Sequence, residues 1–291
     1  MYTKSVKWLT LGDILAEDII FNNEVIIKRD TPLKIMQILL IQNLGLQWVK
    51  VKTSPFLTTV NRATNISHIQ QYFFDFIIHN NQNNRYYYLF ENEEEILSVA
   101  KFFDELLKNE TIVNLLSATN KWDFYSLRHS IDTFILGSLW MKRVNVDYRK
   151  EDCVGFLLHD IGKIKVPREI LWKNGKLTDE ELHIIMKHPE DGANILKNLG
   201  FSNVICEMAN YHHVRLNNTG YPKPYPKNLH IMVCATMIVD VFSALTQERP
   251  YREAISFKDA LDLLMKDRES YAQFLIESFY KFISRCLKKQ K

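Results

Sequence analysis

Residues 154–162 read VGFLLHDIG, an apolar run that ends in a histidine, an aspartate and a turn glycine. The run has the composition of a short buried helix, so it delivers the side chains of His159 and Asp160 into the protein interior just before Gly162. A carboxylate can bridge two metal ions through its two oxygens, and a neighbouring imidazole can bind one of them. One such dipeptide does not predict a metal site by itself, and the prediction depends on further candidate ligands elsewhere in the chain.

Other side chains that could bind metal recur at intervals of about one helix and its connection. They are His129, His188, His212, His213 and Asp240. Because the chain from residue 92 onward has helical periodicity and short loops, these residues can lie on different helices of one bundle. Bundles build metal sites in their cores from side chains on facing helices. The sequence therefore predicts a mainly α fold with a metal site inside a helical bundle.

Asp240 lies within an apolar segment, residues 231–242, that is expected to be buried over most of its surface. An isolated carboxylate is costly there unless it is protonated, paired or bound to a metal. An ion pair with an arginine, or a helix-capping role, explains Asp240 alone equally well.

The histidines also have buried contexts. His212 and His213 continue the apolar stripe of the helix that precedes them. His188 is expected to close a helix that opens with the capping box Thr178 to Glu181, just before Pro189 starts the next helix. Any one histidine is more simply explained as an ordinary core or surface residue, so it is their joint occurrence that favours a metal centre.

Residues 1–60 are predicted to form a small, β-rich α+β module. Two β-branched runs, residues 17–21 and 25–28, are joined through Asn22-Asn23, which is typical of a hairpin. Thr31-Pro32 is predicted to be the N-cap and first residue of a helix that ends near Gly45.

Residues 61–91 are expected to be a helical linker with an Asn-rich loop, and residues 92–291 to be an all-α domain. Apolar residues make up 46% of the chain, which suits a globular protein with a sizeable core. The four cysteines are widely spaced, which favours reduced, buried thiols over a disulfide framework.

The charge balance indicates no general attraction to nucleic acid or membranes. Net charge is +3, from 37 basic and 34 acidic residues, and the basic C-terminal tail is short. There is no apolar leader, and no run approaches the roughly 18 apolar residues that span a bilayer. A cytoplasmic protein is expected.

These motifs resemble the HD-GYP family of bacterial cyclic di-GMP phosphodiesterases, a branch of the HD-domain metal phosphohydrolases. The matching segments are His159-Asp160-Ile161-Gly162-Lys163, Gly175-Lys176-Leu177-Thr178, His188-Pro189, His212-His213, Gly220-Tyr221-Pro222, Asp240 and Arg249-Pro250-Tyr251-Arg252. The resemblance covers residues 92–291 and implies an HD-domain helical bundle. Residues 11–18 resemble the short domain that often precedes it.

The resemblance implies two divalent metal ions, of iron or sometimes manganese. One would be held by the residues matching His129, His159, Asp160 and Asp240, and the other by those matching His188, His212 and His213, with Asp160 bridging. Histidine and carboxylate also suit nickel and zinc, so the donor types alone do not select the ion.

The resemblance also implies roles at the substrate. Lys163 would act in catalysis with Asp160 by reaching the phosphate or leaving oxygen. Candidates for contacting phosphate and guanine are Lys176, Tyr221, Arg249, Tyr251 and Arg252. Loop geometry and surface ion pairing explain the residues of this second group almost as well.

The chain departs from the family pattern at several positions. Tyr125 stands where some members place a glutamate for a third metal, so two ions are expected rather than three. Val214 replaces the glutamate of a His-His-Glu motif, Ser243 replaces a common aspartate, and Asn217 and Asn218 replace an aspartate and a glycine. Missing outer carboxylates predict weaker metal binding or slower turnover.

The leading hypothesis is hydrolysis of cyclic di-GMP to pGpG, GMP or both. One alternative is a different substrate, which would be another cyclic dinucleotide or a nucleotide. The other is a metal-bound but weakly active receptor or interaction protein. Expected partners besides the substrate are diguanylate cyclases and, as a homodimer, a second copy of the chain.

Overall fold

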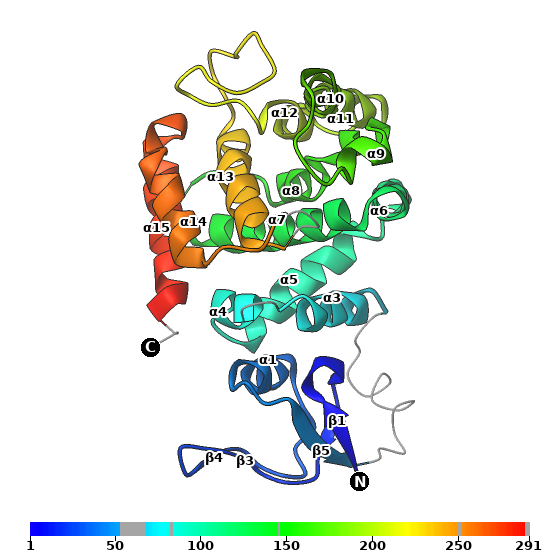
Figure 1. Cartoon of the computed structure of the whole chain (residues 1–291), viewed down its shortest axis with the longest axis vertical. Helices are drawn as coiled ribbons and strands as arrows, with labels where there is room; N and C mark the ends of the chain where they lie inside the picture. Colours follow the sequence, from blue (N-terminus) through cyan, green and yellow to red (C-terminus); the bar gives the residue numbers. More distant parts are fainter. Residues whose placement is uncertain (53–67, 82–83, 145, 249–251, 289–291) are drawn as a thin grey trace. The chain divides into compact units, whose positions relative to one another are not determined.

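The computed structural model describes residues 1–52, 68–81, 84–144, 146–248 and 252–288 (Figure 1). The chain forms two compact units, Met1–Lys108 and a second unit that begins at Asn109. Helices dominate both the second unit and the chain as a whole, and strands occur only near the N-terminus within the described ranges. The prediction of a mainly α chain with a small N-terminal α+β region is confirmed.

The first unit combines short strands with helices, including 3-10 helices labelled η. Its elements are β1 Tyr2–Ser5, η1 Val6–Trp8, β2 Ile14–Leu15, β3 Ile19–Phe21, β4 Glu24–Ile27, α1 Ile35–Asn43, β5 Trp48–Lys52, α3 His68–His79, α4 Arg85–Leu89 and α5 Glu93–Leu106. Strands β1, β5 and β2 form an antiparallel sheet in that order, and β3 and β4 form a separate hairpin.

The hairpin and the first helix test the sequence analysis directly. Asn22 and Asn23 both have positive φ values, of 50° and 65°, as a tight hairpin turn requires, so that prediction is confirmed. The predicted helix start at Thr31-Pro32 is wrong. Pro32 instead forms an isolated β-bridge with Ile14, and α1 begins three residues later, at Ile35.

Both helix ends that carry cap signals behave as expected. Gly45 follows α1 with a φ of +72°, a backbone conformation that glycine adopts without strain. The Asn92 side chain accepts a hydrogen bond from the backbone N–H of Glu95 at 3.0 Å and so caps α5. Three glutamates fill the first turn of α5, where the helix dipole favours negative charge.

The second unit is helical throughout its described residues. Its elements are α6 Glu110–Trp122, α7 Phe124–Arg143, η3 Lys150–Cys153, α8 Val154–Leu158, η4 Ile161–Lys165, α9 Arg168–Leu171, α10 Asp179–Ile185, α11 His188–Asn198, α12 Asn203–Tyr211, α13 Ile231–Thr246, α14 Phe257–Lys266, η5 Arg268–Ser270 and α15 Gln273–Lys288.

Helix α7 lies at the centre of this unit and packs against α6, α8, α13 and α15 (Figure 1). Residues 126–141 of α7 are all buried, and so is most of α13. An aromatic cluster fills the contact of α7, α13 and α15, where the rings of Trp140 and Phe242 lie 4.9 and 5.1 Å from the ring of Phe279. No helix in the described residues combines the length and apolarity needed to cross a bilayer.

Candidate metal centre

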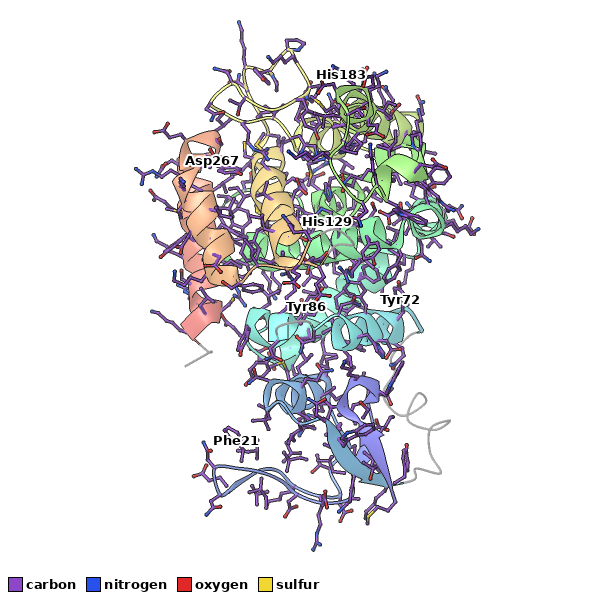
Figure 2. The ribbon with its side chains drawn as sticks, viewed as in Figure 1. Phe21, Tyr72, Tyr86, His129, His183 and Asp267 are labelled. Atoms are coloured by element: carbon purple, nitrogen blue, oxygen red, sulfur yellow. The ribbon has the colours of Figure 1, made fainter. Side chains whose placement is uncertain are left out.

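Seven side chains from five segments of the second unit converge on one buried site. They are His129 on α7, His159 and Asp160 directly after α8, His188 at the start of α11, His212 and His213 directly after α12, and Asp240 on α13. His129, labelled in Figure 2, lies among the helices of this unit and is 2% exposed. All seven residues that the sequence pattern suggested as metal ligands are therefore brought together.

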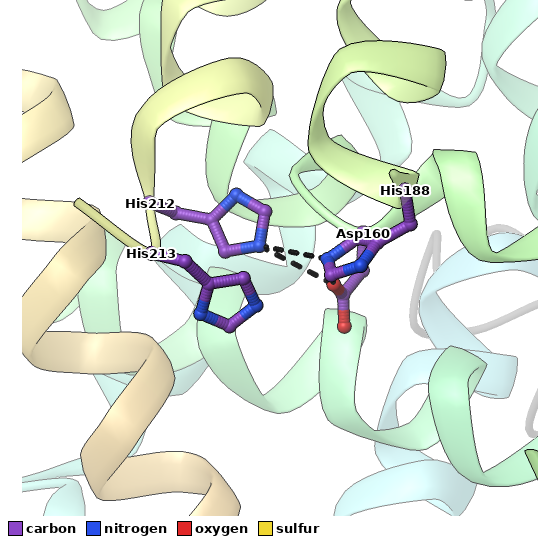
Figure 3. A group of neighbouring side chains, drawn as sticks. All are labelled: Asp160, His188, His212 and His213. Carbon is purple, nitrogen blue, oxygen red and sulfur yellow. Dashed lines mark hydrogen bonds and ion pairs between the residues drawn. The ribbon is translucent and has the colours of Figure 1, made fainter. Parts of the chain in front are cut away.

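The ligand atoms form two groups that share Asp160. Asp160, His188, His212 and His213 form one group, and His129, His159 and Asp160 form the other, with the atoms of each group within 4.8 Å of one another. Figure 3 shows the rings of His188 and His212 directed at the Asp160 carboxylate from different segments. Asp160 is thus placed to bridge two cations.

Asp240 faces both groups from α13. Its Oδ1 atom lies 2.9 Å from Nε2 of His129 and 3.7 Å from Nε2 of His159, and its Oδ2 atom lies 3.8 Å from Nδ1 of His213. The buried carboxylate therefore has imidazole partners and no arginine partner among these contacts, so of the explanations open for Asp240, shared binding of a cation with the histidines fits best.

Three of the histidines have their orientation fixed by the backbone. The Nδ1 atoms of His159, His188 and His212 lie 2.9, 2.7 and 2.8 Å from carbonyl oxygens three residues earlier in the chain. Because a carbonyl only accepts, each Nδ1 carries the hydrogen, and in the neutral ring Nε2 carries the lone pair. All three Nε2 lone pairs are directed into the site, as metal binding requires.

His129 is held by a chain of two side chains instead. Its Nδ1 atom donates to Oγ of Ser243 at 3.0 Å, and the Ser243 hydroxyl donates to Oδ2 of Asp132 at 2.6 Å. Asp132 and Ser243 are fully buried. The negative charge of Asp132 is therefore relayed through Ser243 to His129, which favours the hydrogen on Nδ1 and leaves Nε2 facing the site.

The site contains buried polar atoms whose hydrogen bonding is incomplete among the described residues. Nε2 of His159 and Oδ1 of Asp160 make no hydrogen bond. Nε2 of His188 lies 3.2 Å from Nε2 of His212, although both Nδ1 hydrogens are engaged elsewhere. A direct hydrogen bond between these two Nε2 atoms would need a doubly protonated ring, whereas a cation satisfies both lone pairs. The residues present thus fit bound metal ions.

The protonation states also suit metal binding. Burial lowers the pKa of His212 to about 4, and burial together with the neighbouring His212 lowers the pKa of His213 well below its ordinary value. Burial opposes ionisation of Asp160, but Lys163 and His159 outweigh it and hold the Asp160 pKa well below its usual range. Near neutral pH these two rings are uncharged and the carboxylate is ionised, which are the states that bind cations.

A close backbone contact places Asp160 beside His188. A Cβ atom added to Gly162 would lie 1.9 Å from the backbone oxygen of His188 and 2.5 Å from the backbone nitrogen of Gly192. Only glycine allows η4 and α11 to approach this closely. The structure corrects one boundary here, because α10 ends at Ile185 and His188 opens α11 rather than closing α10.

The loop after His213 folds back onto it. Val214 pairs with Gly220 in a β-bridge, and a Cβ atom on Gly220, whose φ is +84°, would lie 2.1 Å from the His213 oxygen. This turn stacks the Tyr221 ring on His213, with ring centroids 4.7 Å apart and planes at 32°. Tyr221 therefore lies at the edge of the site, as expected of a side chain that contacts substrate.

The other substrate candidates are distributed differently. Nζ of Lys163 lies 2.5 Å from Oδ2 of Asp160, so this lysine borders the site. Lys176 is exposed between α9 and α10, and Arg252 is exposed and donates to the backbone oxygen of Ala244. Arg249 and Tyr251 lie outside the described residues.

The structure shows the surroundings of the positions at which the chain departs from the family pattern. Val214 is 2% exposed and packs inside the turn, while the side chain of Asn217 donates to Oγ of Ser270 at 2.9 Å. At Ser243 the missing carboxylate is supplied by Asp132, which the sequence analysis did not identify. Its position three residues after His129, on the same buried helix, was the available signal.

Comparison with known proteins gives consistent results. Residues 141–273 match the HD domain family model. The chain is 33% identical over 174 residues to a 3'3'-cGAMP-specific phosphodiesterase of Vibrio cholerae, covering 59% of this chain and 38% of the relative. It is 33% identical over 144 residues to a cyclic di-GMP phosphodiesterase of Pseudomonas aeruginosa, covering 48% of this chain and 34% of the relative.

The chain thus spans little more than a third of the length of either relative. Among solved structures, an HDG"Y"P protein from Bdellovibrio bacteriovorus is similar in fold, with a TM-score of 0.50 and 16% identity over 97% of this chain and 99% of that one. That likeness includes the N-terminal unit as well as the helical unit.

Proposed function

Since the chain belongs to the HD-GYP family of HD-domain phosphohydrolases, we propose that it is a metal-dependent phosphodiesterase that hydrolyses cyclic di-GMP to pGpG, GMP or both. The single observation that carries the proposal is the convergence of five imidazoles and two carboxylates around the shared Asp160. Their donor types and protonation states suit a pair of divalent cations.

We propose that the site holds two metal ions, iron with manganese as the alternative. His129, His159 and Asp240 would hold one ion, His188, His212 and His213 the other, and Asp160 both. When bound, such a pair activates water as a nucleophile near neutral pH and neutralises charge on phosphate. With Tyr125 in place of a carboxylate, metal analysis should give two ions per chain, and three would contradict this assignment.

Lys163 has the position of a group that acts on the phosphate. Its ammonium group is anchored by Asp160 and its side chain is 17% exposed, so it faces both the site and the solvent side where substrate enters. A donated hydrogen bond from Nζ would stabilise negative charge on the phosphate or on the leaving oxygen. At the edge of the site formed by His213, the stacked ring of Tyr221 offers a surface to the substrate.

A second candidate substrate is 3'3'-cGAMP. The observation that favours it is the name of the Vibrio cholerae relative, which matches over more of this chain than the Pseudomonas aeruginosa relative does. Both substrates are cyclic dinucleotides with the same phosphodiester linkages, so the metal centre does not distinguish them.

The test is anaerobic purification and metal analysis, followed by incubation with each dinucleotide and separation of the products. We expect metal-dependent conversion of cyclic di-GMP, and loss of it in His159→Ala. Equal, nonzero turnover by that variant would refute the site. Tight binding of cyclic di-GMP without turnover in metal-loaded protein would instead favour a receptor.

We also propose that the N-terminal module, residues 1–60, positions or regulates the catalytic region, residues 92–291. Association with diguanylate cyclases and homodimer formation stay predictions, and both can be measured by co-purification and by light scattering.

A further inference from the structure

A cavity of about 240 Å³ opens beside the metal centre in the second unit. His129 and Lys163 line the end that meets the centre. Tyr125 and Trp172 contribute aromatic rings to its walls, and the apolar lining comes from Ile170, Leu171, Leu177 and Ile185. The cavity therefore joins a cationic, metal-proximal end to an aromatic and apolar interior.

Trp172 is fixed in place although it is 51% exposed. Its indole Nε1 donates to Oδ1 of Asp123 at 3.2 Å. The same carboxylate caps α7 by accepting from the backbone N–H groups of Tyr125 and Ser126 at 3.1 and 3.0 Å. One buried carboxylate thus fixes both the indole and the start of the helix that carries His129.

A second contact restrains the indole from α9. The guanidinium of Arg168 lies 5.6 Å from the centre of the Trp172 ring and 4.7 Å from that of Trp122, within the range of cation–π interactions. A large aromatic side chain that is held at two points, yet left half-exposed in a cavity wall, is preorganised for stacking on a planar ligand.

The charges in the cavity indicate which part of a ligand lies where. Lys173 is paired with Glu181 at 2.6 Å, and Lys163, at the metal-proximal end, is paired with Asp160 at 2.5 Å. The two proposed metal ions would add positive charge beside Lys163 that Asp160 alone does not offset. An anionic group is therefore favoured next to Lys163, and an uncharged ring system against Trp172 and the apolar wall. A nucleotide has this arrangement, with its phosphate joined through a sugar to a base.

We propose that this cavity binds one base of the cyclic dinucleotide while the attached phosphate lies at the metal centre, with Trp172 as the stacking surface. This rests on the proposed function. Pockets that hold a complete drug-sized ligand measure roughly 300–1,000 Å³, so a cavity of about 240 Å³ takes one nucleoside rather than the whole dinucleotide. Trp172 then sets the affinity for substrates that carry a base, without taking part in bond cleavage.

The test compares Trp172→Ala and Trp172→Phe with the wild type on two substrates. Cyclic di-GMP carries bases, whereas bis(p-nitrophenyl) phosphate presents a phosphodiester without one. Trp48→Ala, at a tryptophan that is 62% exposed in the first unit, is the matched control. Metal content and direct binding of cyclic di-GMP by calorimetry are measured for every variant.

We expect Trp172→Ala to raise KM and Kd for cyclic di-GMP by about 5- to 20-fold, the lower part of the range for loss of one base-stacking contact. Trp172→Phe should recover part of this loss, because a phenyl ring still stacks. Metal content and kcat should match the wild type. The KM for bis(p-nitrophenyl) phosphate should rise less than that for cyclic di-GMP, because a single nitrophenyl ring offers less stacking area than guanine. Trp48→Ala should match the wild type throughout.

Unchanged KM and Kd for cyclic di-GMP in an active Trp172→Ala protein would overturn the base-binding site while leaving the proposed function intact. An equal loss on both substrates would do the same, since it would indicate a structural role. A metal-loaded wild type that neither binds nor hydrolyses cyclic di-GMP, yet cleaves bis(p-nitrophenyl) phosphate, would refute the choice of substrate and the base site together.

Discussion

Ser243→Ala removes the hydroxyl group that links His129 to Asp132. The wild-type hydroxyl accepts from Nδ1 of His129 at 3.0 Å and donates to Oδ2 of Asp132 at 2.6 Å, and all three residues are buried. Alanine and serine have nearly the same volume, so the effect of the substitution comes from the loss of the two hydrogen bonds.

The expected magnitude follows from the chemistry of these bonds. A buried neutral hydrogen bond contributes about 1 kcal/mol and one to a carboxylate about 1.5–3 kcal/mol, so the free energy of unfolding of the metal-free protein should fall by about 2.5–4 kcal/mol. Groups that orient a metal-binding histidine typically change metal affinity by about 10- to 100-fold. Each tenfold loss of affinity also removes about 1.4 kcal/mol of metal-dependent stabilisation at saturating metal.

Metal affinity is measured by competition with a chromophoric chelator, and stability by urea unfolding with and without metal. Thr236→Val is the matched control, because its buried hydroxyl lies on the same helix but donates to the backbone oxygen of Met232 at 2.7 Å. It should lose about 1 kcal/mol of stability and no metal affinity. Asp132→Asn should fall between wild type and Ser243→Ala. If Ser243→Ala kept the metal affinity of the wild type, the proposed role of Ser243 and Asp132 in orienting His129 would be refuted.

Three further predictions concern the same site. The unfolded chain takes up a proton at His212 near pH 6.5 and the folded chain only near pH 4, so the free energy of unfolding of the metal-free protein should decrease as the pH is lowered between these values. Urea unfolding should show a decrease from pH 6.5 to 5 that is about 2 kcal/mol smaller in His212→Asn. Equal decreases in the two proteins would contradict the buried, neutral ring. Gly162→Ala should destabilise the protein by about 1–3 kcal/mol or more and reduce its metal content, because the added Cβ meets backbone atoms of α11. Gly192→Ala should destabilise the protein less, because the nearest atom to its Cβ lies at 3.1 Å. The reverse order of the two variants in thermal unfolding would be inconsistent with the close contact at Gly162. Asp160→Asn removes the charge shared by both metal groups, so elemental analysis should find less than half of the wild-type metal, and full retention would exclude the bridging role.

The sequence identified the residues that converge on the site because each signal was local. A polar residue at the end of an apolar helix is buried by the same packing that buries the helix, and this holds for His159, Asp160 and His212. Asp240 is buried because it lies within the apolar helix α13. The hairpin turn at Asn22-Asn23 is local in the same sense, since two residues with positive φ determine it.

The failures came from contacts that the local pattern does not contain. Thr31-Pro32 has the composition of a helix start, but the pairing of Pro32 with Ile14 holds the segment extended. Ser243 is 111 residues from Asp132 and 114 from His129, and Trp172 is 49 residues from Asp123. Such pairs depend on how helices pack, and one sequence without that packing does not specify them.

The hydrogen bonds that link His129 through Ser243 to Asp132 change the metal affinity expected from the departures from the family pattern. With Ser243 in place of an aspartate, the sequence indicated an outer shell short of carboxylates and therefore weak metal binding. Asp132 on α7 instead provides a carboxylate, which is linked to His129 through the serine hydroxyl. Val214 differs, because it is buried inside the turn that holds Tyr221 on His213 and its apolar side chain brings no carboxylate to that turn. Any weakening of the centre should therefore fall on the ion proposed for His188, His212 and His213 rather than on the one proposed beside His129, so the two sites should lose metal to a chelator at different concentrations.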